Sequence, residues 1–408
     1  MKWKKVEKPK QKEKIKVLWY SNSPNLKTGY GKVTREVCSR LVNDLKYDIH
    51  VLGENYIGKT VDFLGFKLHG REQNEQEIVA LQKAILKIKP DVLIILEDSF
   101  TCYRQGFHTV NFGDVKTIFY LPLDGGNIVT TGHEVLRNIN KIIAMSDFTH
   151  DELAKENFDS SVIWHGVDTY DFRPANNSEK SYLRKKHGIA EDCILGVYFG
   201  RNSVRKRTNR LLEAAVNACL ENDKLRFFLH IMHYKSRDLD CEDFVRRIMK
   251  SKCGRDMVEE RRIIFNPKAI RHENAPSDKE VAEYIQMSDF TVSSTSGEGS
   301  GLLSPESFAC GIPTIVTNYT TSEEWLEKYA EEYGKRGLLV PIESYDTTSY
   351  NSEHALINIE ELKKSILWMA DNLVQCKQMG INGRKFVVDK CDWNILIKDW
   401  KHEIEAIL

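Results

Sequence analysis

The sequence lacks any long apolar run. Across 408 residues there is no stretch of about 18 consecutive apolar residues, which a membrane-spanning helix needs. The basic first residues are not followed by the apolar core of a secretory signal, because the nearby apolar run from Ile15 to Tyr20 is short and predicts a strand. We therefore expect a cytoplasmic protein, and the composition excludes an integral membrane protein built of helices.

A disulfide framework and a metal motif are also lacking. The nine cysteines are odd in number and form no Cys-x-x-Cys pair, so they indicate neither disulfides nor a zinc site. His230 and His233 are a possible metal half-site, but both lie in the apolar run RFFLHIMHY, which strand packing explains better. The one Asp-x-Asp, at Asp238–Asp240, falls in a charged segment that we interpret as surface. We expect no metal site.

Net charge is absent as well, since 59 basic residues balance 59 acidic ones. No global field therefore draws the protein toward nucleic acid. Residues 1–16 are an exception, because eight lysines and two glutamates give them a net charge of +6. Few hydrophobic residues occur there, and we predict a disordered tail over residues 1–14. A solvated tail is the simpler interpretation, and a peripheral contact with an anionic membrane or a nucleic acid is the alternative.

Length and pattern together predict two domains. Roughly 100–200 residues form one domain, and short apolar runs alternate with amphipathic segments in two series. The first series comprises IKVLWYSNS, DIHVLG, PDVLIILED, VKTIFYLPLD and KIIAMSD, and the second comprises CILGVYFGR, RFFLHIMH, RIIFNP, FTVSST, TIVTN and GLLVP. Such alternation predicts an α/β protein with two Rossmann-like, doubly wound domains that face a central cleft. We place them at 15–178 and 179–390, with a linker near 174–180.

The stretch TSGEGSGLLSPESFACGIPTIV, Thr295–Val316, predicts an anion site. It follows a strand and reads as a glycine-rich turn and a short helix, in which Ser304 is the cap, Pro305 the first position and Gly311 the end. Backbone N–H groups at such a helix start can converge on a phosphate. The residues that would supply them are Gly301, Leu302 and Leu303.

Two carboxylates, Glu298 and Glu306, flank that turn. A carboxylate repels a phosphate, so we expect their partners to be neutral, and sugar hydroxyl groups donate well to carboxylates. The pattern favours a phosphate with a sugar on each side. In the alternative interpretation, Glu306 only improves the helix dipole and Glu298 is solvated.

A basic loop follows the first strand of the second domain. Between CILGVYFGR and the helical segment NRLLEAAV, the chain carries Arg201, Arg205, Lys206, Arg207 and Arg210. Cations at a helix start oppose the helix dipole unless an anion joins them. Arg201 as a fork and Lys206 as a point charge can bind a diphosphate. We interpret Arg207 and Arg210 as solvated neighbours, and a solvated basic patch is the alternative for the whole loop.

With these residues assembled, the sequence from about Lys16 to Leu408 resembles the family 4 retaining glycosyltransferases of the GT-B fold. The resemblance rests on four stretches in this order: TGYGKVTREV, VIWHGVDTYDFRP, GRNSVRK and EGSGLLSPE. The last contains the family's pair of glutamates separated by seven residues and is the most specific. The final segment, 391–408, is similar to the family's C-terminal helix that crosses back onto the first domain.

The resemblance implies a role for each matching residue. Arg201, Lys206 and the backbone of residues 301–303 would bind the diphosphate of the donor. Glu306 would take the ribose hydroxyls and Glu298 the hydroxyls of the transferred sugar. Gly29 and Gly31 would let the first domain approach the same phosphates.

We therefore expect a retaining glycosyltransferase that moves a sugar from a nucleotide diphosphate sugar to an acceptor hydroxyl. Cationic side chains would stabilise the leaving group in place of a metal, so no cofactor is expected. Many family members carry a histidine at a strand end of the first domain, where this sequence has Asp98 and Asp124, and both are candidates to orient the acceptor or the donor sugar.

Other functions stay open at this point. The same fold hosts sugar epimerases and phosphorylases, and a catalytically silent nucleotide-sugar or nucleic-acid binder is a further alternative. The sequence does not indicate the nucleobase, the sugar or the acceptor. A glycan, a lipid-linked sugar, a protein and a modified nucleic acid all remain possible acceptors.

Overall fold

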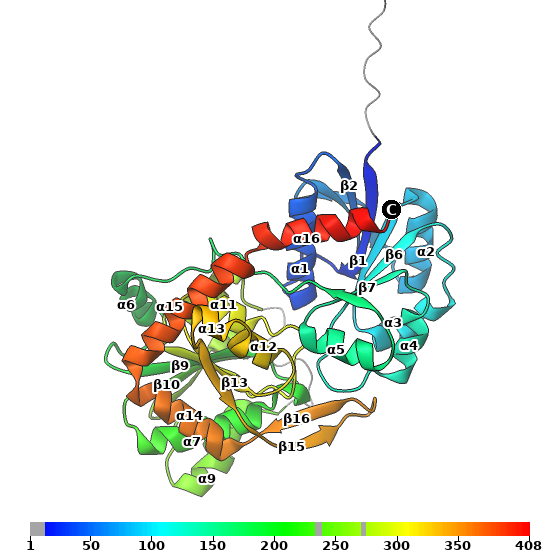
Figure 1. The fold of residues 1–408 in the computed structure, drawn as a ribbon. Coiled ribbons are helices and arrows are strands. Elements are labelled where there is room, and N and C mark those ends of the chain that lie inside the picture. The colour runs from blue at the N-terminus through cyan, green and yellow to red at the C-terminus, as the bar shows by residue number, and fades with distance from the viewer. Residues whose placement is uncertain (1–12, 233–238, 271–274) are drawn as a thin grey trace, which may run out of the picture.

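The computed structural model describes residues 13–232, 239–270 and 275–408, and within them it contains two separate parallel sheets covered by helices (Figure 1). The predicted α/β fold with two doubly wound halves is confirmed. The tail predicted over residues 1–14 lies almost entirely outside the described residues, as do His233 and Asp238.

The first sheet has eight strands in the order β3-β4-β2-β1-β5-β6-β7-β8, and only the β3–β4 pair is antiparallel. Its strands are β1 (Ile15–Asn22), β2 (Tyr47–Ile57), β3 (Val61–Phe63), β4 (Phe66–Arg71), β5 (Val92–Leu96), β6 (Lys116–Leu121), β7 (Lys141–Ala144) and β8 (Ser160–Val162). Its helices are α1 (Gly29–Leu41), α2 (Glu77–Ile88), α3 (Ser99–Gln105), α4 (Thr130–Leu136) and α5 (Asp147–Lys155). Helices α2 to α5 pack on one face and α1 on the other, which explains why β5 is buried at every position.

The second sheet has six parallel strands in the order β11-β10-β9-β12-β13-β14. They are β9 (Ile194–Arg201), β10 (Leu225–Met232), β11 (Ile263–Phe265), β12 (Phe290–Val292), β13 (Thr314–Thr317) and β14 (Gly337–Val340). This is the strand order of dinucleotide-binding folds, in which the winding direction reverses between β9 and β12.

The helices of the second half cover both faces of its sheet. They are α6 (Asn177–Lys186), α7 (Thr208–Glu221), α8 (Cys241–Asp243), α9 (Lys250–Cys253), α10 (Asp278–Gln286), α11 (Leu303–Ala309), α12 (Thr321–Glu327), α13 (Ala330–Tyr333), α14 (Ile359–Asp371) and α15 (Leu373–Lys390). Short 3-10 turns occur at η1 (Phe107–Thr109), η2 (Val204–Lys206) and η4 (Pro267–Ile270), and a π-helical turn at η3 (Phe244–Met249).

The last helix, α16 (Trp393–Ala406), crosses from the second half back onto the first, as predicted (Figure 1). Asp392 caps it by accepting a hydrogen bond from the backbone of Asn394. Its apolar face joins the core beside α1, where the Trp400 ring lies 5.2 Å from that of Trp19 and 4.8 Å from that of Tyr120. The two halves are thus connected both by the linker and by the C-terminal helix.

An antiparallel hairpin, β15 (Ile342–Thr347) and β16 (Glu353–Ile357), extends from the second half to the first. The sequence did not predict it. Gly126 and Glu353 exchange two backbone hydrogen bonds of 3.0 and 2.9 Å, and the Tyr350 ring stacks on Phe100 of α3 at 4.8 Å. The hairpin therefore bridges the two halves beside the carboxyl ends of β5 and β6.

Local capping sets the starts of helices α6 and α1. Helix α6 begins at Asn177, inside the predicted linker, because Asn176 and Glu179 form a capping box there. Helix α1 begins at Gly29, with Thr28 as the cap, and Gly31 lies in its first turn and not in a loop. A Cβ on Gly31 would lie 2.7 Å from the Leu26 carbonyl oxygen, so this glycine is required by local packing whatever binds nearby.

Candidate functional site

The predicted site residues gather where the carboxyl ends of the two sheets face each other. Residues 202–207 follow β9 and residues 293–302 follow β12, on either side of the point where the second sheet reverses its winding. Asp98 follows β5 and Asp124 follows β6 in the first sheet. Doubly wound sheets bind their ligands at this kind of position.

Glu298 is the centre of an ion-pair cluster. The Arg205 Nη1 lies 2.9 Å from Glu298 Oε2, and the Lys206 ammonium contacts the other oxygen of the same carboxylate. Arg205 also places its Nε 2.9 Å from Asp124 Oδ2 in the first half. The site thus holds two cations and two carboxylates from both halves of the molecule.

These charges fix the ionisation of Glu298. Burial alone would raise the pKa of this carboxyl, but Arg205 and Lys206 outweigh burial and lower the pKa to about 2. The pKa of Asp124 is also lowered, because Arg205 and His354 more than offset the effect of burial. Both carboxylates are therefore charged at neutral pH and can accept hydrogen bonds but not donate them.

Asp98 lies in a more acidic environment. Tyr30 Oη donates a hydrogen bond of 2.9 Å to Asp98 Oδ1. Burial and the nearby Asp124 raise the pKa of Asp98 to about 6, and burial together with Asp98 raises that of Glu97 to about 10. The two carboxyl groups thus differ: Asp124 is ionised at neutral pH, whereas Asp98 titrates close to neutral pH.

His354 reaches this site from strand β16 of the hairpin. Its Nε2 lies 3.6 Å from Asp124 Oδ1. The expected family histidine comes from the first domain, whereas this one comes from the second half. The hairpin has no strong sequence signature, so the sequence alone could not place His354 here.

Glu306 lies at the other side of the glycine-rich turn and pairs with a cation from the first half. Lys32 Nζ on α1 lies 2.7 Å from Glu306 Oε1 and 3.2 Å from Asp278 Oδ1 on α10. Lys32 and Glu306 are only 7 and 4% exposed. Burial raises the pKa of Glu306, and Lys32 opposes that rise. The sequence contained Lys32 within the motif TGYGK but gave no signal for this partner.

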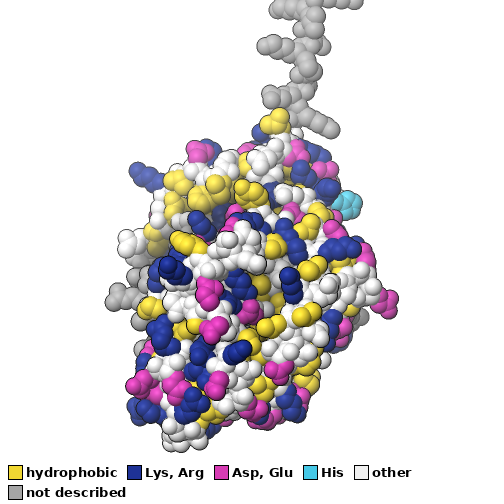
Figure 2. All heavy atoms as spheres, turned by 90° about the vertical axis from the view of Figure 1, so that its left-hand side faces the viewer, with side chains coloured by type: hydrophobic (Ala, Val, Ile, Leu, Met, Phe, Trp, Pro, Cys, Tyr) yellow, Lys and Arg dark blue, Asp and Glu magenta, His cyan; other side chains and the backbone are white. Residues whose placement is uncertain are grey.

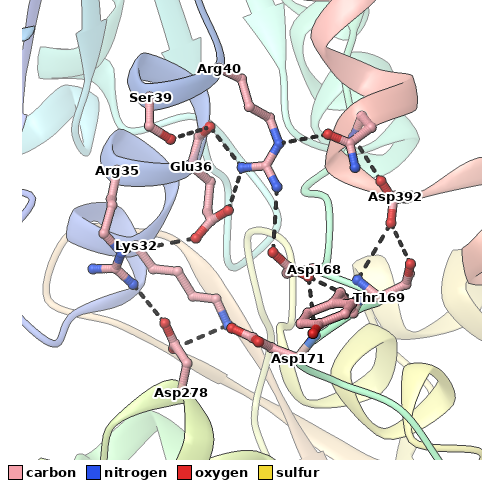
Figure 3. A network of polar contacts seen from close by, with 12 residues as sticks. Lys32, Arg35, Glu36, Ser39, Arg40, Asp168, Thr169, Asp171, Asp278 and Asp392 are labelled. Atoms are coloured by element: carbon pink, nitrogen blue, oxygen red, sulfur yellow. Dashed lines mark hydrogen bonds and ion pairs between the residues drawn. The ribbon is translucent and has the colours of Figure 1, made fainter. Parts of the chain in front are cut away.

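Helix α1 makes further polar contacts around Lys32 (Figure 3). Arg35 Nη2 lies 2.6 Å from Asp278 Oδ2, and Arg40 Nη2 lies 3.5 Å from Asp168 Oδ2 in the segment that joins the two halves. Arg40 also donates to Asn394 at the start of α16. One basic helix of the first half is therefore connected to α10, to the linker and to the C-terminal helix.

The glycines of the turn allow close contact between the two halves. A Cβ on Gly297 would overlap the carbonyl oxygen of Asp124, and one on Gly299 would lie 2.6 Å from the Cβ of Pro122. The sequence analysis assigned the glycines to anion binding. The structure gives Gly297 and Gly299 a second reason, which is the approach of the loop after β6.

Helix α11 starts two residues earlier than predicted. It spans Leu303–Ala309 with Leu302 at the cap position, so Ser304 and Pro305 lie inside the helix and Ser304 is not its cap. The N–H groups of a first helical turn have no partner within the helix. Between the two halves, a Cβ on Gly29 would lie 3.5 Å from Leu302 Cδ1, so the starts of α1 and α11 face each other.

The basic loop differs from its prediction. Arg201 is exposed at the end of β9. Arg205, to which the sequence assigned no role, contacts the carboxylates of Asp124 and Glu298. We expected Arg207 and Arg210 to be solvated, and this is wrong. They pair with Asp346 and Glu343 of β15 at 2.5 and 2.6 Å. They support the hairpin.

Several other features are absent from the described part of the chain. No group of three or more His, Cys, Asp or Glu side chains within residues 13–232, 239–270 and 275–408 can hold a metal ion. Among these residues, no helix has both the length and the apolar character to span a bilayer. On the face shown in Figure 2, basic and acidic side chains are interspersed, which agrees with the balanced composition.

No protein-family model matches the sequence, and no curated protein matches it. Solved structures do share its fold. Sucrose-phosphate synthase from Thermosynechococcus elongatus has a TM-score of 0.73 at 14% identity, covering 96% of this chain and 98% of that chain. A glycosyltransferase from Rickettsia africae has a TM-score of 0.69 at 16% identity, covering 97 and 98%. HepE from Anabaena, in complex with UDP and glucose, has a TM-score of 0.68 at 13% identity, covering 96 and 100%.

This chain has the GT-B fold. The structural neighbours named above span nearly its whole length, so the likeness includes both sheets and the C-terminal crossing. At identities of 13 to 16% it is evidence for the fold and not for the chemistry. The function must be argued from the site.

Proposed function

We propose that the protein is a retaining glycosyltransferase that moves a sugar from a nucleotide diphosphate sugar to an acceptor hydroxyl. The observation that carries this proposal is the cluster of Arg205 and Lys206 around Glu298, at the point where the second sheet reverses its winding. Glu306 lies eight positions further along the chain, at the start of α11. Two cations and two carboxylates in this region support the proposal, because a diphosphate flanked by two sugars would need both kinds of group.

The cations act on the leaving group. As the bond to the anomeric carbon breaks, negative charge grows on the diphosphate, and Arg201, Lys206 and the first N–H groups of α11 stabilise it. Arg205 holds Glu298 and Asp124 in place beside them. In this scheme cationic side chains take the role that a metal ion has in other transferases, which makes the reaction metal-independent.

The carboxylates bind the two sugars. Glu306 accepts hydrogen bonds from the ribose hydroxyls, and Glu298 accepts them from the transferred sugar. Lys206 contacts Glu298 in this structure. When the donor binds, its ammonium contacts both this carboxylate and the diphosphate. Gly29 and Gly31 allow the start of α1 to approach the phosphates.

The acceptor hydroxyl enters from the side of Asp98 and Asp124. The leaving phosphate oxygen takes the acceptor proton on the same face of the sugar, so no separate base is needed. Asp124 and Asp98 then orient the acceptor or the transferred sugar, with Tyr30 and His354 as their partners. In this proposal the protein works in the cytoplasm, and a contact of the lysines of residues 1–14 with an anionic surface stays the alternative to a solvated tail.

A donor panel tests the proposal. Purified protein is incubated with UDP-, GDP- and ADP-sugars in excess EDTA, and hydrolysis and transfer are followed by NMR, which also gives the anomeric configuration of the product. UDP-glucose is tested first, because HepE is described in complex with it. Product of retained configuration, formed without added metal, is the expected result. Epimerised donor, phosphate-dependent release of sugar, or binding without turnover would each favour an alternative function.

Variants of the two glutamates should affect the binding of different parts of the donor. Glu306→Gln should weaken binding of the nucleoside diphosphate itself. Glu298→Gln should leave that binding nearly unchanged and slow sugar transfer, because only the transferred sugar loses its acceptor. Equal losses of free nucleotide affinity in both variants, measured by calorimetry, would reject this division.

A further inference from the structure

Lys32 contacts three segments besides its own helix. It comes from α1 and contacts Glu306 on α11 and Asp278 on α10. Its Nζ lies 4.3 Å from the ring centroid of Phe172, a fully buried residue of the segment that joins the two halves. A lysine this deeply buried loses the hydration of its charge, and only paired carboxylates and an aromatic face compensate for that loss.

Two different purposes would produce this contact. Lys32 can be an interdomain tie, like Arg35, which pairs with the same Asp278 carboxylate. It can also serve the carboxylate of Glu306. The geometry distinguishes the two, because Arg35 reaches only Asp278 among these carboxylates, whereas Lys32 places its shorter contact, 2.7 Å, on Glu306.

We infer that Lys32 is a positioning residue for donor binding: its ammonium keeps the Glu306 carboxylate ionised and directed toward the ribose hydroxyls. This inference rests on the proposed function, in which Glu306 binds the ribose. A carboxylate offers about four acceptor positions, and Lys32 occupies one of those on Oε1. The remaining acceptor positions can serve two hydroxyl groups. Lys32 thereby contributes to nucleotide binding through Glu306, without a contact of its own with the nucleotide.

The charges around Glu306 make this role necessary. Lys32 faces it from α1 and Asp278 from α10, and Cys310 is the titratable neighbour on α11 itself. His165 of the linker lies near Lys32 and is uncharged at neutral pH, because burial lowers its pKa to about 3. Lys32 is thus the cation that faces Glu306 among these groups. Without Lys32, a carboxylate buried beside another carboxylate favours its protonated form.

The test measures binding of UDP, ADP and GDP to Lys32→Met, Lys32→Arg and Arg35→Met by calorimetry from pH 6 to pH 9. Lys32→Met should bind the preferred nucleotide roughly tenfold or more weakly at pH 7, because hydrogen bonds to a charged acceptor are lost. Its affinity should rise toward pH 9 as Glu306 ionises. Lys32→Arg keeps the charge and should recover most of the affinity.

Arg35→Met is the matched control. It removes the Arg35–Asp278 ion pair, which joins α1 to α10 as the Lys32–Asp278 pair does, and it does not touch Glu306. Its affinity should stay close to that of the wild type and should not gain a pH dependence. Equal losses in Lys32→Met and Arg35→Met, with parallel pH profiles, would overturn the inference and leave Lys32 as an interdomain tie. Wild-type affinity in Lys32→Met would overturn it as well.

Denaturant unfolding without nucleotide separates this inference from the proposed function. Lys32→Met should lose stability relative to Lys32→Met/Glu306→Gln as the pH rises from 5 to 9, because the buried carboxyl must ionise. If this pH dependence appears but the wild type binds none of the three nucleotides, the Lys32–Glu306 coupling holds and the proposed function fails, and with it the ribose role. If nucleotides bind but the pH dependence is missing, the inference alone fails.

Discussion

Arg205 Nη1 lies 2.9 Å from Glu298 Oε2, although 93 positions separate the two residues in the chain. The same guanidinium extends to Asp124 on the first sheet. One arginine therefore links a carboxylate of each half across the cleft. Because guanidinium groups form rigid forks, this contact fixes the distance between the loops after β6 and β12.

Arg205→Ala should abolish most of the activity. It removes the shared partner of Glu298 and Asp124 and leaves Lys206 as the remaining cation of the cluster. Loss of one charge-assisted contact of this kind costs on the order of 2–4 kcal/mol of barrier, or about 30- to 1000-fold in turnover. Steady-state rates with the donor that the panel identifies would measure the effect, and Lys206→Ala should show a loss of the same order.

The control for Arg205 is Arg246→Ala. Arg246 pairs with Glu242 at 2.8 Å in an exposed contact far along the chain from the cleft. Exposed pairs contribute about 0–1 kcal/mol, so its turnover should match the wild type. Near-normal turnover in Arg205→Ala would show that the guanidinium is a structural tie without an effect on the reaction.

Glu97→Gln should stabilise the protein at neutral and alkaline pH. Burial and Asp98 raise the pKa of Glu97 to about 10 in the folded protein, compared with about 4.3 in an unfolded chain. The stability from the protonated form is therefore complete below about pH 4 and is lost progressively as the pH rises toward 10. Glutamine keeps a neutral hydrogen-bonding group, so its advantage should reach on the order of 3–4 kcal/mol near pH 7.

Urea unfolding at pH 4, 6 and 8 would measure this difference. The free energies of unfolding of wild type and Glu97→Gln should converge at pH 4 and diverge as the pH increases. Curves that stay parallel over this range would show that Glu97 is ionised in the folded protein, and the acidic character assigned to the region around Asp98 would then be wrong.

The two sheets could be predicted because their strands are short apolar runs separated by amphipathic helices. The run PDVLIILED became β5, which is buried throughout, and CILGVYFGR became β9. The β15–β16 hairpin could not be predicted. Its strand β15 is mostly exposed and reads IESYDT, so it has no apolar alternation. The hairpin is held in place where Glu353 and Tyr350 contact Gly126 and Phe100 of the first half.

The site was only partly predictable for a similar reason. Glu298, Lys206 and Asp124 follow strand ends, which the sequence marks, and the structure brings them together. Arg205 and Lys32 act through partners 93 and 274 positions away. The Arg205–Glu298 contact follows from how the loops after β9 and β12 meet, and the Lys32–Glu306 contact from how the two halves pack. Sequence spacing carries no information about either.

Gly297→Ala should lower activity by disrupting the close contact between the two halves. The added Cβ would meet the carbonyl oxygen of Asp124, and the backbone of Gly297 has a φ of 153°, which alanine rarely adopts. The loop would move away from Asp124 and weaken the Arg205 contact. We expect at least a tenfold loss of turnover, with nucleotide affinity much less affected, since Glu306 lies on the other side of the turn. Equal losses of nucleotide affinity and turnover would place the effect on the whole turn instead.

Tyr350→Ala should allow more of the donor to react with water. The Tyr350 ring stacks on Phe100 at 4.8 Å and holds the tip of the hairpin against the first half, beside Asp98 and Asp124. Closing a site of this kind excludes water from the reacting sugar. Loosening the hairpin should therefore raise the ratio of donor hydrolysis to transfer severalfold, while nucleoside diphosphate binding stays unchanged because the hairpin does not contact Glu306 or Lys32. Product partitioning at saturating acceptor measures this ratio.

Tyr182→Ala removes an exposed ring from α6, outside the cleft, and should leave the ratio as in the wild type. An unchanged ratio in Tyr350→Ala would mean that the hairpin joins the two halves without controlling access to the acceptor side.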